Sequence, residues 1–352
     1  MSRLRPTIED VAKKSGLSVS TVSLVLNNKA NVSKETRSKV QEAISELKYH
    51  PRGSARGLAS RVSGNIGFIL TEDHFSQSEQ FYTKIFLGTE FEARNHNYYV
   101  ILTTVESSVK EEKQIPRFLL EHNVDGVIVA GKIGSSWLDE INERGLPVVL
   151  VDFESPRHNL SSVAMDNYTG AGLLVQHLYK EGYTRIGFIG GDIKHPSMAQ
   201  RYTGYRKGLE ELGLPVNEAW ISIEEDGTGI ENGVRATSRI ALNKEDGPTA
   251  IFAANDALAI GCIRYIKEQQ MNVPDDIAVV GFDNVEAGIH IEPRLTTINV
   301  RKEEMGAIAL RRMVEMIEVK NTVITHTLTP VELVVRDSSR VKEHVVSPAL
   351  EV

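Results

Sequence analysis

The chain has 352 residues, of which 41% are hydrophobic and 25% charged, so it is long enough for two or three domains and too apolar to be largely disordered. A single cysteine, Cys262, excludes an internal disulfide framework and cysteine-rich metal centres. The net charge of −7 is uneven, because residues 1–60 carry +6 and the rest of the chain carries −13. A basic segment on an acidic body favours a head that binds a polyanion, although a solvated charged face has the same composition.

The first fifty residues predict three short helices. Thr7, with an acidic residue three positions on, forms an approximate capping box for the first helix, and Gly16 ends it. Ser18 can cap a second helix over residues 19–26, and Ser33 can start a third. Three short helices with a tight glycine turn between the first two are typical of a helix-turn-helix head, although any small three-helix bundle fits the same pattern.

The second of these helices has two unlike faces. Helical spacing turns Val22, Val25 and Leu26 inward, and it leaves Leu24 on the outer side with Val19, Ser20 and Ser23. Leu24 cannot hydrogen-bond to a base, but it can pack on a thymine methyl group. The alternative is that Leu24 is a fourth core contact, which the occupied inner face disfavours.

Several motifs closely resemble the head of the lactose-repressor (LacI/GalR) family. They are Thr7-Ile8-Glu9-Asp10-Val11-Ala12, Gly16-Leu17-Ser18-Val19-Ser20-Thr21-Val22-Ser23, and Val32-Ser33 with Thr36-Arg37. A later segment is similar to the linker of that family: Tyr49-His50-Pro51 followed by Ala55-Arg56-Gly57-Leu58-Ala59. The resemblance runs from Thr7 to about Arg336. It implies a DNA-binding transcriptional repressor that is not an enzyme and uses no cofactor or metal.

The resemblance also implies a set of DNA contacts. The base-reading positions match Val19, Ser20 and Leu24, and Leu58 matches a leucine that wedges into the minor groove and kinks the duplex. The linker arginines are expected close to phosphates, although a flexible tether would have the same glycine- and serine-rich composition. The predicted DNA contacts are Thr7, Ser18, Val19, Ser20, Thr21, Ser23, Leu24, Asn27, Arg52, Ala55, Arg56 and Leu58.

From about residue 64, short apolar runs alternate with helical stretches. One of these helices has the inward stripe Ala171, Leu174, Val175 and Leu178. Continuous apolar strands that alternate with helices predict doubly wound parallel sheets, and the length allows two such halves. The candidate strands are residues 66–70, 99–103, 126–129, 148–152, 186–189, 250–253 and 278–282.

The resemblance implies that the two halves form an α/β periplasmic-binding-protein-like body. The expected organisation is a helix-turn-helix domain over residues 1–51, a hinge helix or linker over 52–62, a first effector-binding subdomain over 63–163 plus 291–325, a second over 164–290 plus 326–340, and a mobile tail over 341–352. In the expected return to the first half, Leu295-Thr296-Thr297-Ile298 precedes a helix around residues 306–317. The tail contains Pro348 and no sustained heptads, so we expect a homodimer.

Ligands in open α/β sheets bind beyond the carboxyl ends of the strands, so polar residues at strand ends are candidate effector contacts. Arg201 offers a guanidinium fork, and Asn255 and Asp283 offer an amide and a carboxylate, a combination that suits the vicinal hydroxyls of a sugar. The resemblance implies effector contacts at these three positions, with help from Asp152 and Ser197. It also places an aromatic side chain against the ligand near Gln80, Phe81 and Tyr82.

Each candidate has a structural alternative. Asn255 could only shape its turn, Asp256 could cap the following helix, and Asp283 could pair with Arg201 without a ligand. The aromatic residues after position 80 could form the buried stripe of a helix.

These motifs favour a transcription regulator over an enzyme or a transport receptor. The sequence shows no nucleophile elbow, His-Glu-x-x-His pair or phosphate loop, and a transport receptor needs a secretion signal that the first residues lack. We therefore expect a bacterial cytoplasmic repressor, associated with the nucleoid when it is bound to a pseudo-palindromic operator. A small effector, a sugar or sugar derivative, would control operator affinity allosterically. Relatives divide between sugar inducers and purine or protein corepressors, so the sign of control stays open at this point.

Overall fold

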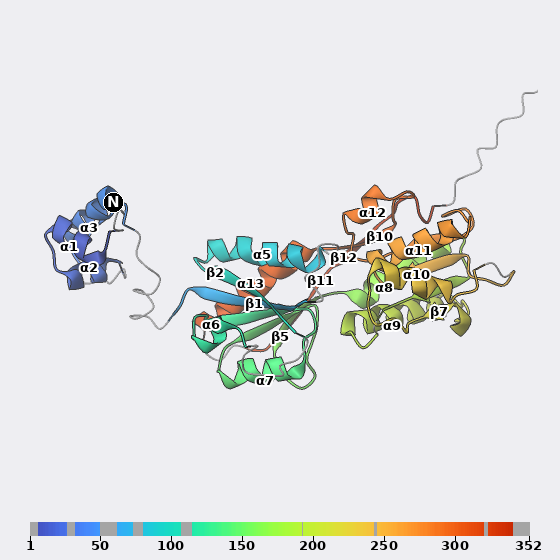
Figure 1. Cartoon of the computed structure of the whole chain (residues 1–352), viewed down its shortest axis with the longest axis horizontal. Coiled ribbons are helices and arrows are strands. Elements are labelled where there is room, and N and C mark those ends of the chain that lie inside the picture. The colour runs from blue at the N-terminus through green and yellow to red at the C-terminus, as the bar shows by residue number, and fades with distance from the viewer. Residues whose placement is uncertain are drawn as a thin grey trace, which may run out of the picture.

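The computed structural model describes residues 6–26, 32–49, 62–72, 80–106, 115–191, 193–242, 245–319 and 323–340. The chain begins with a cluster of three helices, which lies at one end of the molecule in Figure 1. They are α1 (Ile8–Ser15), α2 (Val19–Leu26) and α3 (Lys34–Leu47). These helices pack around a core that includes Val11, Val22, Val25 and Val40. The described head is therefore a helical domain with its own small core.

The ends of the head helices follow the predicted signals. Thr7 forms a capping box with Asp10, and Gly16 ends α1 with a φ of 69°. Ser18 accepts a hydrogen bond from the backbone N–H of Thr21, and Ser33 caps α3. The prediction of three short helices with a glycine turn is confirmed.

The body begins with a six-stranded parallel sheet in the order β11-β5-β4-β3-β1-β2. The strands are β1 (Asn65–Thr71), β2 (Tyr99–Val105), β3 (Gly126–Ala130), β4 (Val148–Val151), β5 (Ser161–Met165) and β11 (His326–Thr329). Helices α5 (Phe81–Asn95) and α13 (Lys302–Glu318) cover one face, and α6 (Arg117–Leu120) and α7 (Ser135–Glu143) lie on the other (Figure 1). The sheet and its helices form the first subdomain.

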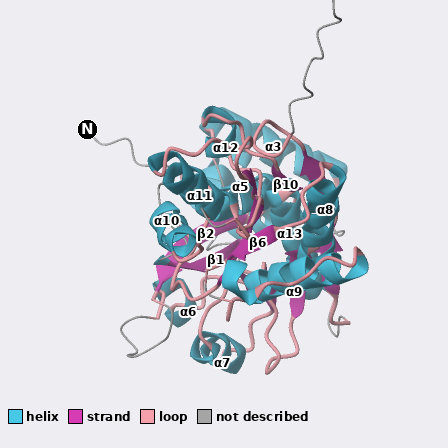
Figure 2. Cartoon of the chain, turned by 90° about the vertical axis from the view of Figure 1, so that its right-hand side faces the viewer, coloured by secondary structure: helices cyan, strands magenta, loops and turns pink. Residues whose placement is uncertain are grey.

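The second subdomain contains a four-stranded parallel sheet in the order β7-β6-β8-β9. Its strands are β6 (Ile186–Ile189), β7 (Ile221–Ser222), β8 (Ala250–Ala253) and β9 (Ala278–Val280), and a short 3-10 helix, η3 (Glu218–Trp220), precedes β7. Helices α8 (Asn167–Lys180) and α9 (Pro196–Glu211) lie on one side of β6, and α10 (Ile230–Ser238) and α11 (Asp256–Glu268) lie on the other (Figure 2). The predicted architecture of a helical head and an α/β body with parallel sheets is confirmed.

The chain after α12 crosses between the subdomains at other points than expected. After α12 (Ala287–His290), strand β10 (Thr297–Val300) makes parallel bridges to the β9 side, and it pairs antiparallel with β12 (Val331–Val334). Strand β11 pairs with β5 in the first sheet. The expected boundaries at 291 and 326 therefore need correction, because residues 297–300 lie with the second subdomain and residues 302–329 with the first.

The predicted strands lie within a few residues of the observed ones, and the stripe of α8 is fully buried. Strands β5, β7, β10, β11 and β12 were not predicted. None of the helices in the described ranges combines the length and hydropathy that a membrane crossing requires.

Candidate functional site

Three of the predicted effector residues form a hydrogen-bonded bridge between the subdomains. The Tyr82 hydroxyl, at the start of α5, donates to Oδ2 of Asp152 at 2.7 Å. The Ser197 hydroxyl, in the first turn of α9, donates to Oδ1 of the same carboxylate at 2.7 Å. Asp152 follows β4 with a φ of 68°, a left-handed conformation that non-glycine residues rarely adopt. One carboxylate thus joins an element of each subdomain.

A second cluster surrounds Arg201, whose guanidinium is buried. Nε donates to Oδ1 of Asn167 at 2.8 Å, Nη1 donates to the carbonyl of Ala254 at 2.7 Å, and Nη2 donates to Oδ1 of Asp283 at 2.9 Å. The guanidinium carbon lies 3.9 Å from the centre of the Phe282 ring. The pairing of Arg201 with Asp283 was the structural alternative considered above, and the structure contains it.

Burial sets the electrostatics of this cluster. Burial raises the pKa of Asp283, while the positive charge of Arg201 lowers it. Burial also raises the pKa of Asp256 to about 7, and the negative charge of Asp283 adds to that increase. Oδ1 of Asp256 accepts a hydrogen bond from the Thr297 hydroxyl, and Oδ2 accepts one from the N–H of Val285. The fold therefore buries the carboxyl groups of Asp256 and Asp283 away from water.

The pKa of Asp256 predicts a pH dependence of stability. A carboxyl whose pKa rises from 3.8 to about 7 on folding keeps its proton at pH values where the unfolded chain has lost it, so stability falls as the pH rises through this range. The groups that act on it are Asp283, Lys302 and Arg336. In urea unfolding between pH 4 and 7, Asp256→Asn should flatten the decline by up to about 1 kcal/mol per pH unit. Parallel curves for the two proteins would contradict the raised pKa.

Asn255 shapes the start of α11. Its Oδ1 accepts a hydrogen bond from the N–H of Leu258 at 2.8 Å, so Asn255 caps the helix. Its Nδ2 donates to the carbonyl of Thr228 at 3.1 Å. The expectation that Asp256 caps this helix is wrong, because Asp256 is the first helical residue and its carboxylate bonds elsewhere.

The aromatic pair at the start of α5 is buried. Phe81 and Tyr82 pack edge to face with ring centres 5.0 Å apart, while the preceding Gln80 is exposed. Both aromatic side chains therefore belong to the packed interior, and the Tyr82 hydroxyl still reaches the Asp152 carboxylate.

In the head, α2 presents the predicted outer face. The side chains of Val19 and Leu24 are 42% and 45% exposed, and Ser20 is exposed. Ser18 shares hydrogen bonds of 2.8 Å with the hydroxyls of Ser20 and Thr21. The alternative that Leu24 is a core contact is therefore wrong. The predicted contacts Asn27, Arg52, Ala55, Arg56 and Leu58 lie outside the described residues.

Two buried residues of the site, Asn167 and Lys302, were not predicted from the sequence. Asn167 supports Arg201 and also donates to Oε1 of Gln200 at 3.0 Å. Lys302 donates to the carbonyl of Asp283. Asn167 lies two residues after β5, so recognition of that strand could have found it by the same strand-end rule. Lys302 follows a crossing between subdomains, and no local signal marks it.

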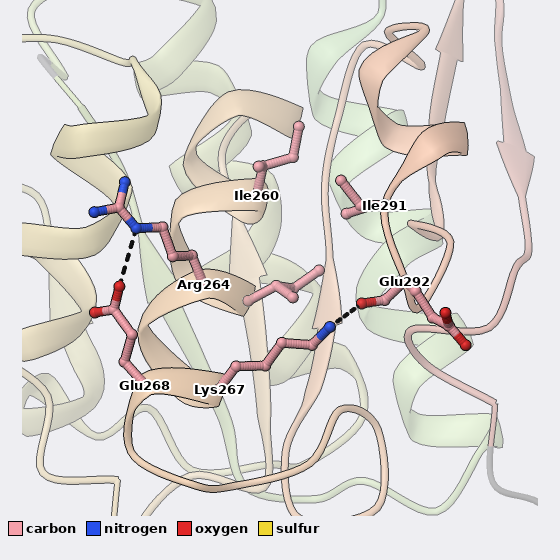
Figure 3. Close-up of a pocket in the computed structure, with 7 residues that line it drawn as sticks. Ile260, Arg264, Lys267, Glu268, Ile291 and Glu292 are labelled. Carbon is pink, nitrogen blue, oxygen red and sulfur yellow. Dashed lines mark hydrogen bonds and ion pairs between the residues drawn. The ribbon is translucent and has the colours of Figure 1, made fainter.

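A groove of about 480 Å³ lies elsewhere, on the second subdomain between α11 and the segment after α12 (Figure 3). Ile260, Ile263 and Ile291 form its apolar part. The Lys267 ammonium donates to the carbonyl of Glu292 across it. None of the predicted effector residues lines this groove, so it is separate from the site between the subdomains.

Comparison with known proteins relates both parts of the chain to one family. Residues 7–52 match the family described as bacterial regulatory proteins, lacI family, and residues 175–339 match the periplasmic binding protein-like domain. The chain is 34% identical over 307 residues to catabolite control protein A of Priestia megaterium, covering 87% of this chain and 90% of the relative. It is 32% identical over 334 residues to the HTH-type transcriptional repressor PurR of Pasteurella multocida, covering 94% of this chain and 98% of the relative.

Solved structures show the same arrangement. The lac repressor dimer bound to operator and the anti-inducer ONPF matches with a TM-score of 0.79 and 27% identity, over 96% of this chain and 100% of that one. The complex of the transcriptional regulator CelR with cellobiose matches with a TM-score of 0.72 and 30% identity, over 95% and 100%. These relatives act in transcription regulation rather than catalysis.

Proposed function

Because the chain belongs to the lacI family of bacterial regulatory proteins, we propose that it is a homodimeric repressor whose operator affinity is controlled by a small polyhydroxylated ligand bound between the two subdomains. The family supplies DNA binding and transcription regulation. The ligand class, the dimer and the allosteric control are the proposed parts, as is a location in the bacterial cytoplasm and, when operator-bound, at the nucleoid.

The observation that carries DNA binding is the outer face of α2. Val19, Ser20 and Leu24 project from a helix whose other face is packed in the head core, and α2 is the second helix of a helix-turn-helix. The positive charge of residues 1–60 supports the same assignment, because basic side chains attract the phosphate backbone. Bases are then read from α2, and Arg52, Arg56 and Leu58 of the linker are proposed to contact the operator backbone and minor groove.

The residues between the subdomains support a polyhydroxylated ligand. Arg201 and Asp283 supply donors and acceptors on one side, and the bridge of Tyr82, Asp152 and Ser197 supplies them on the other. Asn255 lies at the adjacent strand end, and Gln80 and Phe81 at the start of α5 complete the proposed contacts. Cellobiose in the CelR complex provides a precedent for a sugar in a related regulator.

Control of operator affinity follows from linkage. A ligand that prefers the subdomain arrangement in which the two heads fit adjacent half-sites strengthens operator binding, and one that prefers another arrangement weakens it. The bridge through Asp152 is the contact that a ligand hydroxyl would replace, so ligand binding and subdomain arrangement depend on the same atoms.

A symmetric dimer predicts a symmetric operator. Selection from random duplexes, followed by footprinting, should recover two inverted half-sites about a protected centre, because the two-fold axis of the protein coincides with that of the site. A full-length Leu58→Ala variant should lose specific affinity and keep non-specific affinity. Recovery of a direct repeat or a single half-site would contradict the dimeric mode of binding.

The ligand class can be tested with a thermal-shift panel of monosaccharides, disaccharides and nucleobases on the full-length protein. A compound that binds the folded state raises the unfolding temperature, and the stabilisation grows with the logarithm of its concentration relative to its dissociation constant. A sugar that stabilises the wild type but not the Asp283→Asn variant supports the proposed site. Stabilisation by nucleobases alone would contradict the proposal that the ligand is a sugar.

A further inference from the structure

Lys302 reaches from one subdomain to the other at the base of the site. It is the first residue of α13, which belongs to the first subdomain. Its ammonium donates to the carbonyl of Asp283, which follows β9 in the second subdomain, and to the carbonyl of Val300 at 3.4 Å. The residue is only 3% exposed. A single buried side chain therefore connects the two halves of the body beside the Arg201 cluster.

Lys302 completes the anchoring of Asp283. The N–H of Asp283 donates to the carbonyl of Ile298 at 3.0 Å, and its carboxylate accepts from Arg201. Its φ of 106° lies in the region that side chains rarely adopt, and such a conformation persists only where the surroundings hold it. Of these three contacts to Asp283, the hydrogen bond from Lys302 to the Asp283 carbonyl comes from the first subdomain.

The same ammonium lies beside the start of α5. It is 5.7 Å from the centre of the Phe81 ring, within the range of a cation–π interaction. Helices α5 and α13 are in close contact, because a Cβ added at Gly88 would lie 1.9 Å from the carbonyl oxygen of Glu303. The Lys302 ammonium therefore lies beside the first turn of α5, and the start of α13 packs against the middle of the same helix.

Lys302 places a charged group in the protein interior. Its hydrogen-bond acceptors in the described part of the chain are backbone carbonyls. Burial lowers its pKa, while the negative charges of Asp283 and Asp256 raise it. Burying an ammonium costs desolvation, which the two carbonyl acceptors and the negative charges of Asp283 and Asp256 offset.

We propose that Lys302 is a positioning residue that holds Asp283 in its ligand-binding conformation and couples it to the start of α5, so that occupancy of the site is communicated to the first subdomain. The link to occupancy rests on the proposed function. The positioning itself can be measured on the protein alone, without an effector or an operator.

Hydrogen–deuterium exchange of the full-length protein without added ligand tests this coupling. Lys302→Met should accelerate exchange about tenfold at the amides of residues 283–285, because loss of a charge-assisted hydrogen bond promotes local opening. It should also accelerate exchange in α5, for example at Lys84, whose N–H donates to the carbonyl of Gln80. Lys302→Arg, which keeps charged donors, should restore much of the protection at both places.

Lys267→Met is the matched control. Lys267 also donates to a backbone carbonyl, that of Glu292, but it lies on the groove of Figure 3. This variant should leave exchange at residues 283–285 and in α5 unchanged. Phe81→Leu is the reciprocal variant, since it removes the ring beside the ammonium and keeps both carbonyl contacts. It should accelerate exchange at residues 283–285 although Phe81 is in the other subdomain.

The result that overturns the proposal is exchange that changes only at the site of each substitution. If Lys302→Met does not fold, exchange at residues 283–285 and in α5 in the Phe81→Leu and Lys302→Arg variants distinguishes coupling from local effects. A negative exchange result would refute the role of Lys302 but not the proposal that the protein binds an operator. Failure to find an operator would refute that proposal but not the exchange result, so the two can be tested separately.

Discussion

Replacement of Arg201 with alanine is expected to lower the free energy of unfolding by about 3–5 kcal/mol, because it leaves a buried carboxylate without its partner. Arg201 is 2% exposed, and its guanidinium serves Asn167, Ala254 and Asp283 at once. Urea unfolding of the wild type and the variant measures the loss. The same variant should show no thermal shift with any sugar that stabilises the wild type.

Two further variants make this result interpretable. Arg206→Ala, on the same helix, removes an exposed ion pair with Glu218, and it should cost less than about 1 kcal/mol. Combining Arg201→Ala with Asp283→Asn neutralises the orphaned carboxylate and should recover part of the stability. A loss for Arg201→Ala as small as that for Arg206→Ala would mean that the guanidinium does not organise the site.

Replacement of Leu24 with arginine is expected to change which operator the protein selects. Leu24 is 45% exposed on α2, so the head should stay folded, and an arginine there can donate two hydrogen bonds to guanine in the major groove. The preference at one base pair in each half-site should move towards guanine by about 5- to 150-fold, which corresponds to about 1–3 kcal/mol for a bidentate contact. Parallel duplex selections with the wild type and the variant measure the change.

The opposite face of the same helix supplies the control. Val25 is 7% exposed and packs in the head core, so Val25→Arg should unfold the head and abolish binding to all duplexes. An unchanged base preference for a folded Leu24→Arg head would mean that this side chain does not face the bases.

The head could be predicted almost entirely because its signals are local. The cap at Thr7, the left-handed Gly16 and the caps at Ser18 and Ser33 each act within one helical turn. The burial of Val22 and exposure of Leu24 follow from helical periodicity alone. Strands such as β6 and β8 were predicted with their observed bounds, since a short continuous apolar run is typical of a buried parallel strand.

The crossings between subdomains could not be predicted from local pattern. Strand β11, with the sequence His-Thr-Leu-Thr, pairs with β5, whose register partners lie 164 positions earlier in the chain. Neither segment is strongly apolar, and their pairing is specified by the sheet edge that the rest of the fold leaves free. For the same reason the expected boundaries at 291 and 326 were wrong.

The sequence by itself determined the helix-turn-helix head, the two parallel-sheet halves and the position of Asp283 just beyond a strand end, because each depends on residues close in the chain. Only the tertiary structure decided that Arg201 pairs with Asp283, that Asp152 joins Tyr82 to Ser197, and that Lys302 reaches Asp283. These contacts join segments that the chain crossings bring together, so their geometry exists only after both subdomains have formed.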